Sequence, residues 1–133
     1  YLITDLKREV MAKAVIIKVS GDKEVVEFQV GKSYELLSKS VGGMIECISL
    51  TNVIGQPDMW INEEGKIIGL EQNPMATALW FDMYGASDVI LGDIIITGGA
   101  DEEGETLGLS DEQVDYFMGY ASSMFYAGGV SLS

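Results

Sequence analysis

The sequence predicts an α+β domain with one mostly antiparallel, strongly twisted sheet, two longer helices and one short helix. A hydrophobic content of 47% with only two prolines indicates a packed core. Short β-prone runs bounded by turn residues predict the strands, and apolar residues at helical spacing behind N-cap signals predict the helices. A chain of 133 residues fits one domain, which we place at residues 11–126 with an acidic second half.

The first third of the chain predicts three strands and the short helix. The strands are expected at residues 13–20, 25–30 and 44–50, and the helix at residues 34–41. A turn around Gly21 joins the first two strands as a hairpin. Ser33 is the expected N-cap of the helix, and Gly42 is its expected stop.

The middle of the chain predicts a second hairpin followed by a long helix. Residues 59–61 and 66–70 are the two expected strands, joined by a turn at Gly65. Asn73 offers an N-cap acceptor, and Pro74 is suited to the first helical position. The apolar face of this helix is expected to comprise Ala76, Leu79, Trp80 and Met83, before a stop at Gly85.

The last third predicts more β-structure, a loop and a final helix. Residues 88–91 and 94–97 flank Gly92-Asp93, which is either a hairpin turn or a bulge within one long strand. Residues 98–109 are glycine-rich and acidic and are expected to form a surface loop. Ser110 and Gln113 form a capping box that opens a helix. Its expected apolar residues are Val114, Phe117, Met118, Ala121 and Phe125.

Both ends of the chain are expected to lie outside the domain. Met11 precedes a strand directly and looks like an initiation site, so residues 1–10 are interpreted as an upstream or vector-derived segment. Residues 127–133 are expected to be a frayed tail.

Four blocks in order carry a family resemblance. They are VGGMIECISL (41–50), MWINEEGKIIGL (59–70), NPMATAL (73–79) and DVILGDIIITGG (88–99). The chain resembles the family called domain of unknown function 3846, short proteins of phages, plasmids and bacteria, over about residues 13–99. Glu71-Gln72 departs from the proline-containing linker expected there, and the acidic segment after Gly99 lies outside the resemblance. The resemblance implies a mobile-element context and a shared fold, but no activity.

Charge is the strongest global feature of the sequence. The formal net charge is −13, all eight Lys and Arg precede residue 67, and 11 Asp and Glu follow Lys66. Such a field repels phosphates and anionic lipids, so we expect no direct nucleic-acid binding and no membrane binding. A host protein with a basic surface is the expected partner, and pairing of copies through free edge strands is a further expectation.

Localisation follows from what the sequence lacks. No apolar run approaches the roughly 20 residues of a membrane span, and no secretory signal is recognisable. One cysteine, Cys47, excludes an internal disulfide. We expect a cytoplasmic protein, in the host cytoplasm if a phage encodes it.

The residue inventory excludes several catalytic classes. The chain has no histidine, which removes Ser-His-Asp and Cys-His nucleophiles and histidine zinc sites. Cys47 has no basic sequence neighbour and is expected to be a buried, inert thiol. Glu63 and Glu64 are interpreted as wet turn residues rather than an acid/base pair. We expect no enzyme, no cofactor and no metal.

Two groups of residues are candidates for a binding site. The first is an acidic surface that would contact a basic partner, as in an accessory protein that inhibits or modulates a host protein; it comprises Asp101, Glu102, Glu103, Glu105, Asp111, Glu112 and Asp115. A calcium loop starting at Asp101 would need glycine at position 106, which is Thr106. The alternative is a pocket that sequesters a small molecule or nucleotide, lined by Trp60, Asn62, Asn73 and Thr77.

Overall fold

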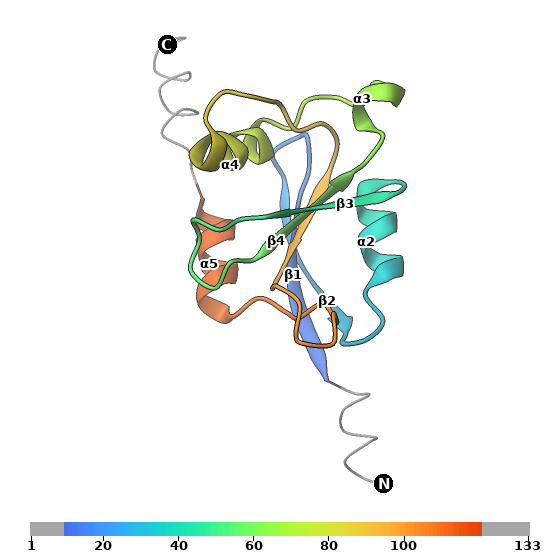
Figure 1. Ribbon diagram of the computed structural model, residues 1–133, viewed down its shortest axis with the longest axis vertical. Coiled ribbons are helices and arrows are strands. Elements are labelled where there is room, and N and C mark those ends of the chain that lie inside the picture. Colours follow the sequence, from blue (N-terminus) through green and yellow to red (C-terminus); the bar gives the residue numbers. More distant parts are fainter. Residues whose placement is uncertain (1–9, 121–133) are drawn as a thin grey trace, which may run out of the picture.

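The computed structural model describes residues 10–120 and contains one sheet with helices on both faces (Figure 1). Neighbouring strands run antiparallel in the order β2-β1-β5-β4-β3. The strands are β1 (Met11–Ile17), β2 (Lys23–Gln29), β3 (Ile45–Ser49), β4 (Asp58–Asn62) and β5 (Ile94–Thr97). The helices are α2 (Tyr34–Val41), α3 (Gly65–Ile68), α4 (Pro74–Tyr84) and α5 (Asp111–Gly119). The predicted α+β class is confirmed.

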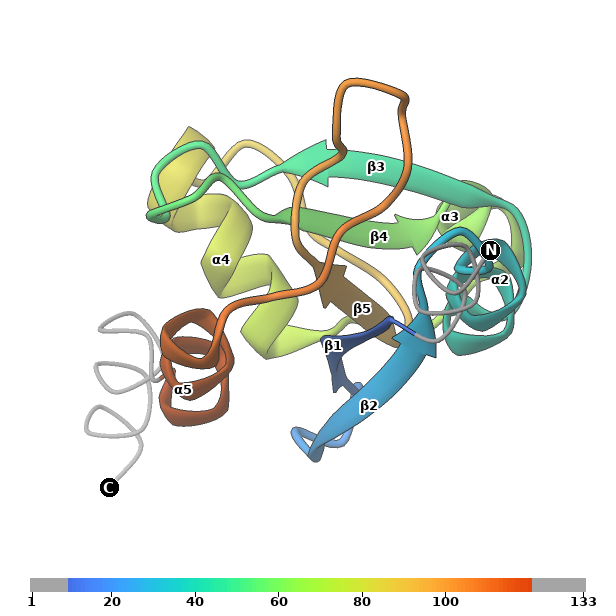
Figure 2. The same cartoon turned by 90° about the horizontal axis from the view of Figure 1, so that it is seen from below.

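Two hydrophobic clusters lie on opposite faces of the sheet because successive strand residues point to opposite sides. Helix α2 covers the face that carries Ala14, Phe28 and Ile95. Helices α4 and α5 cover the other face, where Val15 and Ile96 belong to the larger cluster. Figure 2 shows α4 and α5 on the side opposite to α2. With both faces covered, every residue of the central strand β5 is buried.

Local capping signals place the two longer helices. Asn73 accepts a hydrogen bond from the Ala76 N–H at 3.1 Å and Pro74 occupies the first turn of α4. Ser110 and Gln113 form the expected capping box of α5. Ser33 stands at the N-cap of α2 but makes no side-chain cap bond, while Gly42 ends that helix with φ 79°.

The prediction of a strand at residues 66–70 is wrong, because this segment begins with the helical turn α3. Both edges of β4 are already paired, with β3 on one side and β5 on the other, so a returning strand has no free edge. The side chain of Asn62 accepts a hydrogen bond from the Glu64 N–H at 2.8 Å and turns the chain. Gly69 ends α3 with φ 73°, and Ile67 is left 82% exposed.

Residues 88–91 are not a strand either, so Gly92-Asp93 is neither a hairpin turn nor a bulge. This segment pairs instead with the residues before α4, through an isolated bridge between Gln72 and Leu91. Two short main-chain bonds fix it, from the Asn73 N–H to the Ile90 C=O at 2.8 Å and from the Gly92 N–H to the Glu71 C=O at 2.7 Å. Gly92 turns the chain into β5 with φ 84°.

Some predicted segments lie outside the described residues. The last helix was expected to carry Ala121 and Phe125, but the description of α5 ends at Gly119 with its C-cap at Tyr120. The tail at residues 127–133 and residues 1–9 of the upstream segment also lie outside. No helix within residues 10–120 is long and apolar enough to cross a membrane.

Candidate functional site

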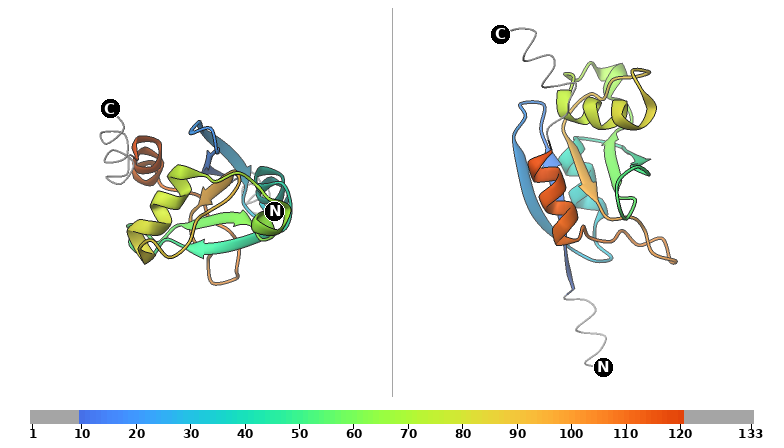
Figure 3. Two further views of the ribbon diagram at one scale, coloured as in Figure 1. Left: turned by 90° about the horizontal axis from the view of Figure 1, so that it is seen from above. Right: turned by 90° about the vertical axis from the view of Figure 1, so that its left-hand side faces the viewer.

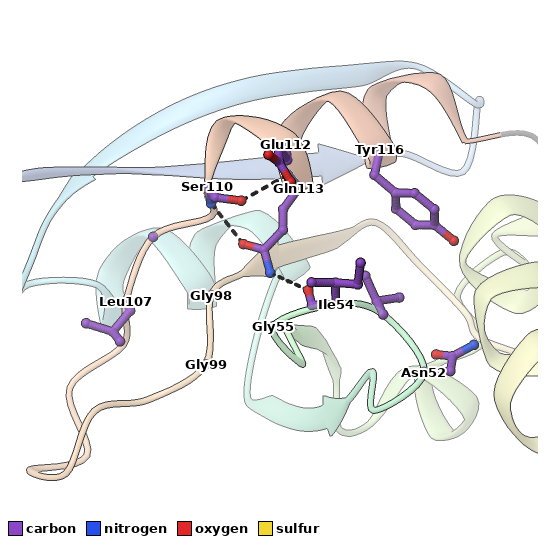
Figure 4. A pocket seen from close by; sticks show the side chains of 12 residues that line it. Asn52, Ile54, Gly55, Gly98, Gly99, Leu107, Ser110, Glu112, Gln113 and Tyr116 are labelled. Carbon is purple, nitrogen blue, oxygen red and sulfur yellow. Dashed lines mark hydrogen bonds between the residues drawn. The ribbon is translucent and has the colours of Figure 1, made fainter.

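A groove of about 510 Å³ lies between two loops and the first half of α5 (Figure 4). Figure 3 shows α5 and the loop that leads into it from β5. One loop, residues 51–57, joins β3 to β4, and the other, residues 98–110, joins β5 to α5. The residues that line the groove are Asn52, Val53, Ile54, Gly55, Gly98, Gly99, Leu107, Gly108, Ser110, Glu112, Gln113 and Tyr116.

Gln113 holds the walls of the groove together. Its Oε1 accepts a hydrogen bond from the Ser110 N–H at 2.8 Å, and Ser110 Oγ accepts one from the Gln113 N–H at 3.1 Å. Its Nε2 donates to the main-chain oxygen of Ile54 at 2.8 Å (Figure 4). One side chain therefore both starts α5 and ties this helix to the loop at residues 51–57. Gly55 passes so close that a Cβ there would lie 2.5 Å from Gln113 Nε2.

Two glycines let the loop at residues 98–110 fold tightly onto the sheet. A Cβ at Gly98 would lie 2.3 Å from the Gly108 carbonyl oxygen, and a Cβ at Gly108 would lie 2.6 Å from Ala12 Cβ. The Leu109 N–H then donates to the Lys13 carbonyl at 2.9 Å. This wall of the groove is thus anchored to β1 by close contacts that a larger residue at Gly98 or Gly108 would prevent.

Apolar side chains line this groove and remain open to water. Ile54 is 89% exposed and Tyr116 is 46% exposed, and Leu107 is exposed as well. In Figure 4, Ile54 lies between Leu107 and Tyr116. Burial and then the Asp82 carboxylate raise the pKa of Tyr116. A tyrosine phenol is protonated at neutral pH even without such a shift, so Tyr116 can donate a hydrogen bond.

The seven predicted acidic residues are all exposed and lie in the loop and helix that form the groove. Glu112 lines the groove itself. Asp111 pairs with Lys13 at 3.2 Å, an exposed contact, and Asp115 lies further along α5. The other four carboxylates belong to the loop that leads into α5: Asp101, Glu102, Glu103 and Glu105.

Asp101 organises the tip of this loop. Its carboxylate accepts hydrogen bonds from the N–H groups of Glu103 at 2.8 Å and Glu105 at 3.0 Å. The main chain closes the same turn, where Gly104 donates to the Asp101 carbonyl. The carboxylates of Glu102 and Glu103 are exposed beside this turn. No three His, Cys, Asp or Glu residues in the described part of the chain are grouped so as to hold a metal.

The residues of the alternative pocket are not gathered around one cavity. Trp60 packs on the α2 side of the sheet, while Thr77 belongs to α4 on the other face. Of the cavities described, Asn62 lines one of about 170 Å³, which Trp60, Asn73 and Thr77 do not line.

The polar groups of these four residues bind within the protein. Trp60 Nε1 donates to Thr97 Oγ1 at 2.9 Å, and Asn62 Nδ2 donates to the Val41 carbonyl at 3.1 Å. Asn73 Nδ2 donates to the carbonyls of Ile17 and Gly92 at 3.0 Å each. Thr77 Oγ1 accepts from the Ile90 N–H at 2.9 Å.

Cys47 is exposed on β3, so the expectation that it is buried is wrong. Partial covering of its thiol by the surrounding protein raises its pKa to about 12, with further contributions from the charge and a hydrogen bond of Asp58. A thiol with such a pKa is almost fully protonated near neutral pH and is a poor nucleophile, despite its exposure.

Sequence reasoning did not single out the apolar residues of the groove. Ile54, Leu107 and Tyr116 come from segments far apart in the chain, and none stands in a motif. The sequence contained only indirect signs of the groove. The sequence shows the capping residue Gln113 and the glycines that permit close approach. It does not show that Gln113 packs against the loop at residues 51–57.

The fold and the groove define a small α+β domain with an open apolar surface cavity. The chain belongs to the family described as domain of unknown function DUF3846, whose model matches residues 11–122. The family suspected from the four sequence blocks is confirmed. The match also includes the acidic loop and α5, which lay outside the recognised blocks. No curated protein and no solved structure matches the chain significantly.

Proposed function

We propose that this domain is a non-enzymatic accessory protein that binds a basic segment of another protein in the groove beside α5. The observation that supports this proposal is an apolar groove with exposed Ile54 and Tyr116, lined also by Glu112 and formed in part by the loop and helix that carry the other exposed carboxylates. The mobile-element context implied by the family resemblance makes a host protein the partner. Binding would inhibit or modulate that protein in the host cytoplasm.

The apolar part of the groove supplies binding free energy. An isoleucine exposed as fully as Ile54 leaves most of its side chain in water in the free protein. Covering such a side chain contributes about 2 kcal/mol. Tyr116 offers a large ring and a phenol donor at the same site. A partner with one Leu, Ile or Phe side chain fits this surface.

The acidic residues near the groove favour a partner with basic residues on either side of its apolar side chain. Residues 67–133 contain 11 Asp and Glu and no Lys or Arg. Among the described residues, Asp111 is the one member of the acidic surface that forms an ion pair, with Lys13. The remaining carboxylates form no ion pair within the described residues and can attract Lys and Arg, which accelerates association and makes binding weaken as salt rises.

The groove is largely preformed, which lowers the cost of ordering it on binding. Gln113 ties the loop at residues 51–57 to α5, and the close approach of Gly98 to Gly108 fixes the other wall. The alternative pocket near Trp60 remains a prediction. The contacts of its four residues do not favour it, because their polar groups already bond within the protein.

The proposal is tested with an array of Lys- and Arg-rich peptides that each carry one Leu, Ile or Phe. Ile54→Asp is expected to weaken binding of the best peptide by about 30-fold, the equivalent of about 2 kcal/mol. Ile67→Asp is the matched control, since Ile67 is 82% exposed on α3, which lies far from α5 (Figure 1) and does not line the groove. Equal loss in both variants, or no binding of any peptide at low salt, would contradict the proposal.

A further inference from the structure

We propose that the outer edge of β3 is a homodimer interface, at which β3 strands of two copies pair antiparallel with their register centred on Cys47. Strand β3 is the last strand of the sheet on this side (Figure 2). The interface is separate from the groove and does not depend on its function.

Two hydrogen bonds at the ends of β3 determine which of its main-chain groups face outward. The Glu63 N–H donates to the Met44 carbonyl, and the Leu50 N–H donates to the Pro57 carbonyl, both at 2.8 Å. Hydrogen-bonded pairs alternate along an antiparallel ladder, so even-numbered residues of β3 bond to β4. The N–H and C=O groups of Ile45, Cys47 and Ser49 therefore point away from the sheet.

Nothing in the described part of the chain pairs with these outward groups. The hydrogen bonds of Ser49 and Cys47 with Asp58 involve their side chains, not their main chain. The strand also lacks the features that usually protect an edge, since it contains no proline, no lysine and a single charged residue, Glu46. The opposite edge strand, β2, carries Lys23, Glu24 and Glu27.

A second copy of the chain fits this edge because the strand is complementary to itself. A twofold axis at Cys47 pairs Ile45 with Ser49 of the partner subunit, and Cys47 with Cys47 of the partner subunit. Each of the outward residues then exchanges both main-chain bonds, about six in total. In this register Glu46 lies opposite Ile48 of the partner subunit, so no two carboxylates of the strands face each other.

The charge of the chain gives this interface a distinctive salt dependence. Each copy carries a net charge of −13, and the acidic loop at residues 98–110 reaches past β3 (Figure 2). Two copies repel each other at low ionic strength, and salt screens that repulsion. Dimerisation should therefore strengthen with salt, whereas binding of a basic segment in the groove should weaken. The two proposals can thus fail independently.

Sedimentation velocity of the whole chain tests the interface. We expect a monomer–dimer equilibrium up to about 100 µM, with a dissociation constant that falls between about 0.05 and 0.5 M NaCl. Cys47→Pro removes an outward N–H while sparing the bonds to β4, and should raise the dissociation constant by about 10-fold or more. A protein that stays monomeric under all these conditions would overturn the proposal.

Val25→Pro is the matched control on the other edge. The Val30 N–H bonds to the Val10 carbonyl, which places the N–H of Val25 outward on β2 in the same way. This variant should dimerise like the parent protein, and loss of the dimer here rather than in Cys47→Pro would overturn the assignment. Cys47→Glu keeps the main chain intact and places two carboxylates at the axis. It should also dissociate the dimer, while an unchanged dimer would refute the register.

Discussion

At the scale of single residues, Asn73 links three parts of the fold. It is fully buried, caps α4, and donates to the carbonyls of Ile17 and Gly92. Its amide thereby joins β1 to the turn that precedes β5. The sequence predicted the cap, because a cap depends on neighbours in the chain. It could not predict the other two bonds, which depend on how distant segments meet.

Asn73→Ala should lower the free energy of unfolding by about 3 kcal/mol, because it removes a cap and leaves two buried carbonyls without a donor. Urea denaturation measures the change. Ser33→Ala is the matched control, since Ser33 holds the N-cap position of α2 without a side-chain cap bond. It should cost less than about 0.5 kcal/mol. Similar losses in both variants would show that the two amide bonds contribute little.

Cys47 provides a prediction about pH. Its pKa in the folded protein is raised from 9.0 to about 12, so the unfolded chain loses this proton at lower pH than the folded one. Below pH 9 the Cys47 thiol is protonated in both the folded and the unfolded protein, so it does not change the free energy of unfolding with pH. As pH rises from 9 towards 12, the unfolded chain loses the proton first, and the free energy of unfolding falls. At pH 8, alkylation by iodoacetamide should be more than about 10-fold slower in the folded protein than in urea. Equal rates would contradict the raised pKa.

At the scale of elements, the sequence predicted helix starts better than strand pairing. The capping residues Asn73 and Ser110 stand where expected, because each cap bonds within three residues of itself. Residues 66–70 have a β-prone composition but no partner, since β3 and β5 occupy both edges of β4. Likewise, Cys47 is exposed on the edge strand β3, and neither its exposure nor the place of β3 in the sheet follows from the local sequence.

Gly98→Ala should destabilise the junction between β5 and the acidic loop. Its Cβ would meet the Gly108 carbonyl oxygen at 2.3 Å, a main-chain atom that cannot move without breaking the contact with β1. We expect a loss of about 2 kcal/mol or more in urea denaturation. Gly119→Ala is the control, because a Cβ at that helical position meets nothing within 4 Å. It should be neutral or slightly stabilising, and a Gly98→Ala variant as stable as this control would contradict the close approach.

At the scale of the whole molecule, the acidic residues and the apolar groove lie side by side, because the groove is lined by Glu112 as well as by Ile54, Leu107 and Tyr116. The acidic loop and α5 supply the carboxylates, and the loop at residues 51–57 supplies Ile54. The acidic residues that composition singled out are exposed, as expected of an acidic surface. The basic partner stays a prediction. The groove itself depends on three segments that come together only in the fold, held by the bond from Gln113 to Ile54.

The most direct test of the groove is a methyl and amide NMR titration of the whole chain with a Lys- and Arg-rich peptide that carries a single Phe. We expect the largest shifts at the Ile54 methyl groups and at the amides of Gly55 and Gly98, with the Ile67 methyl groups unchanged. We also expect the shifts to diminish as NaCl is raised. Saturable shifts centred on Ile67, or a peptide that binds without perturbing Ile54, would contradict the assignment of the groove as the binding site.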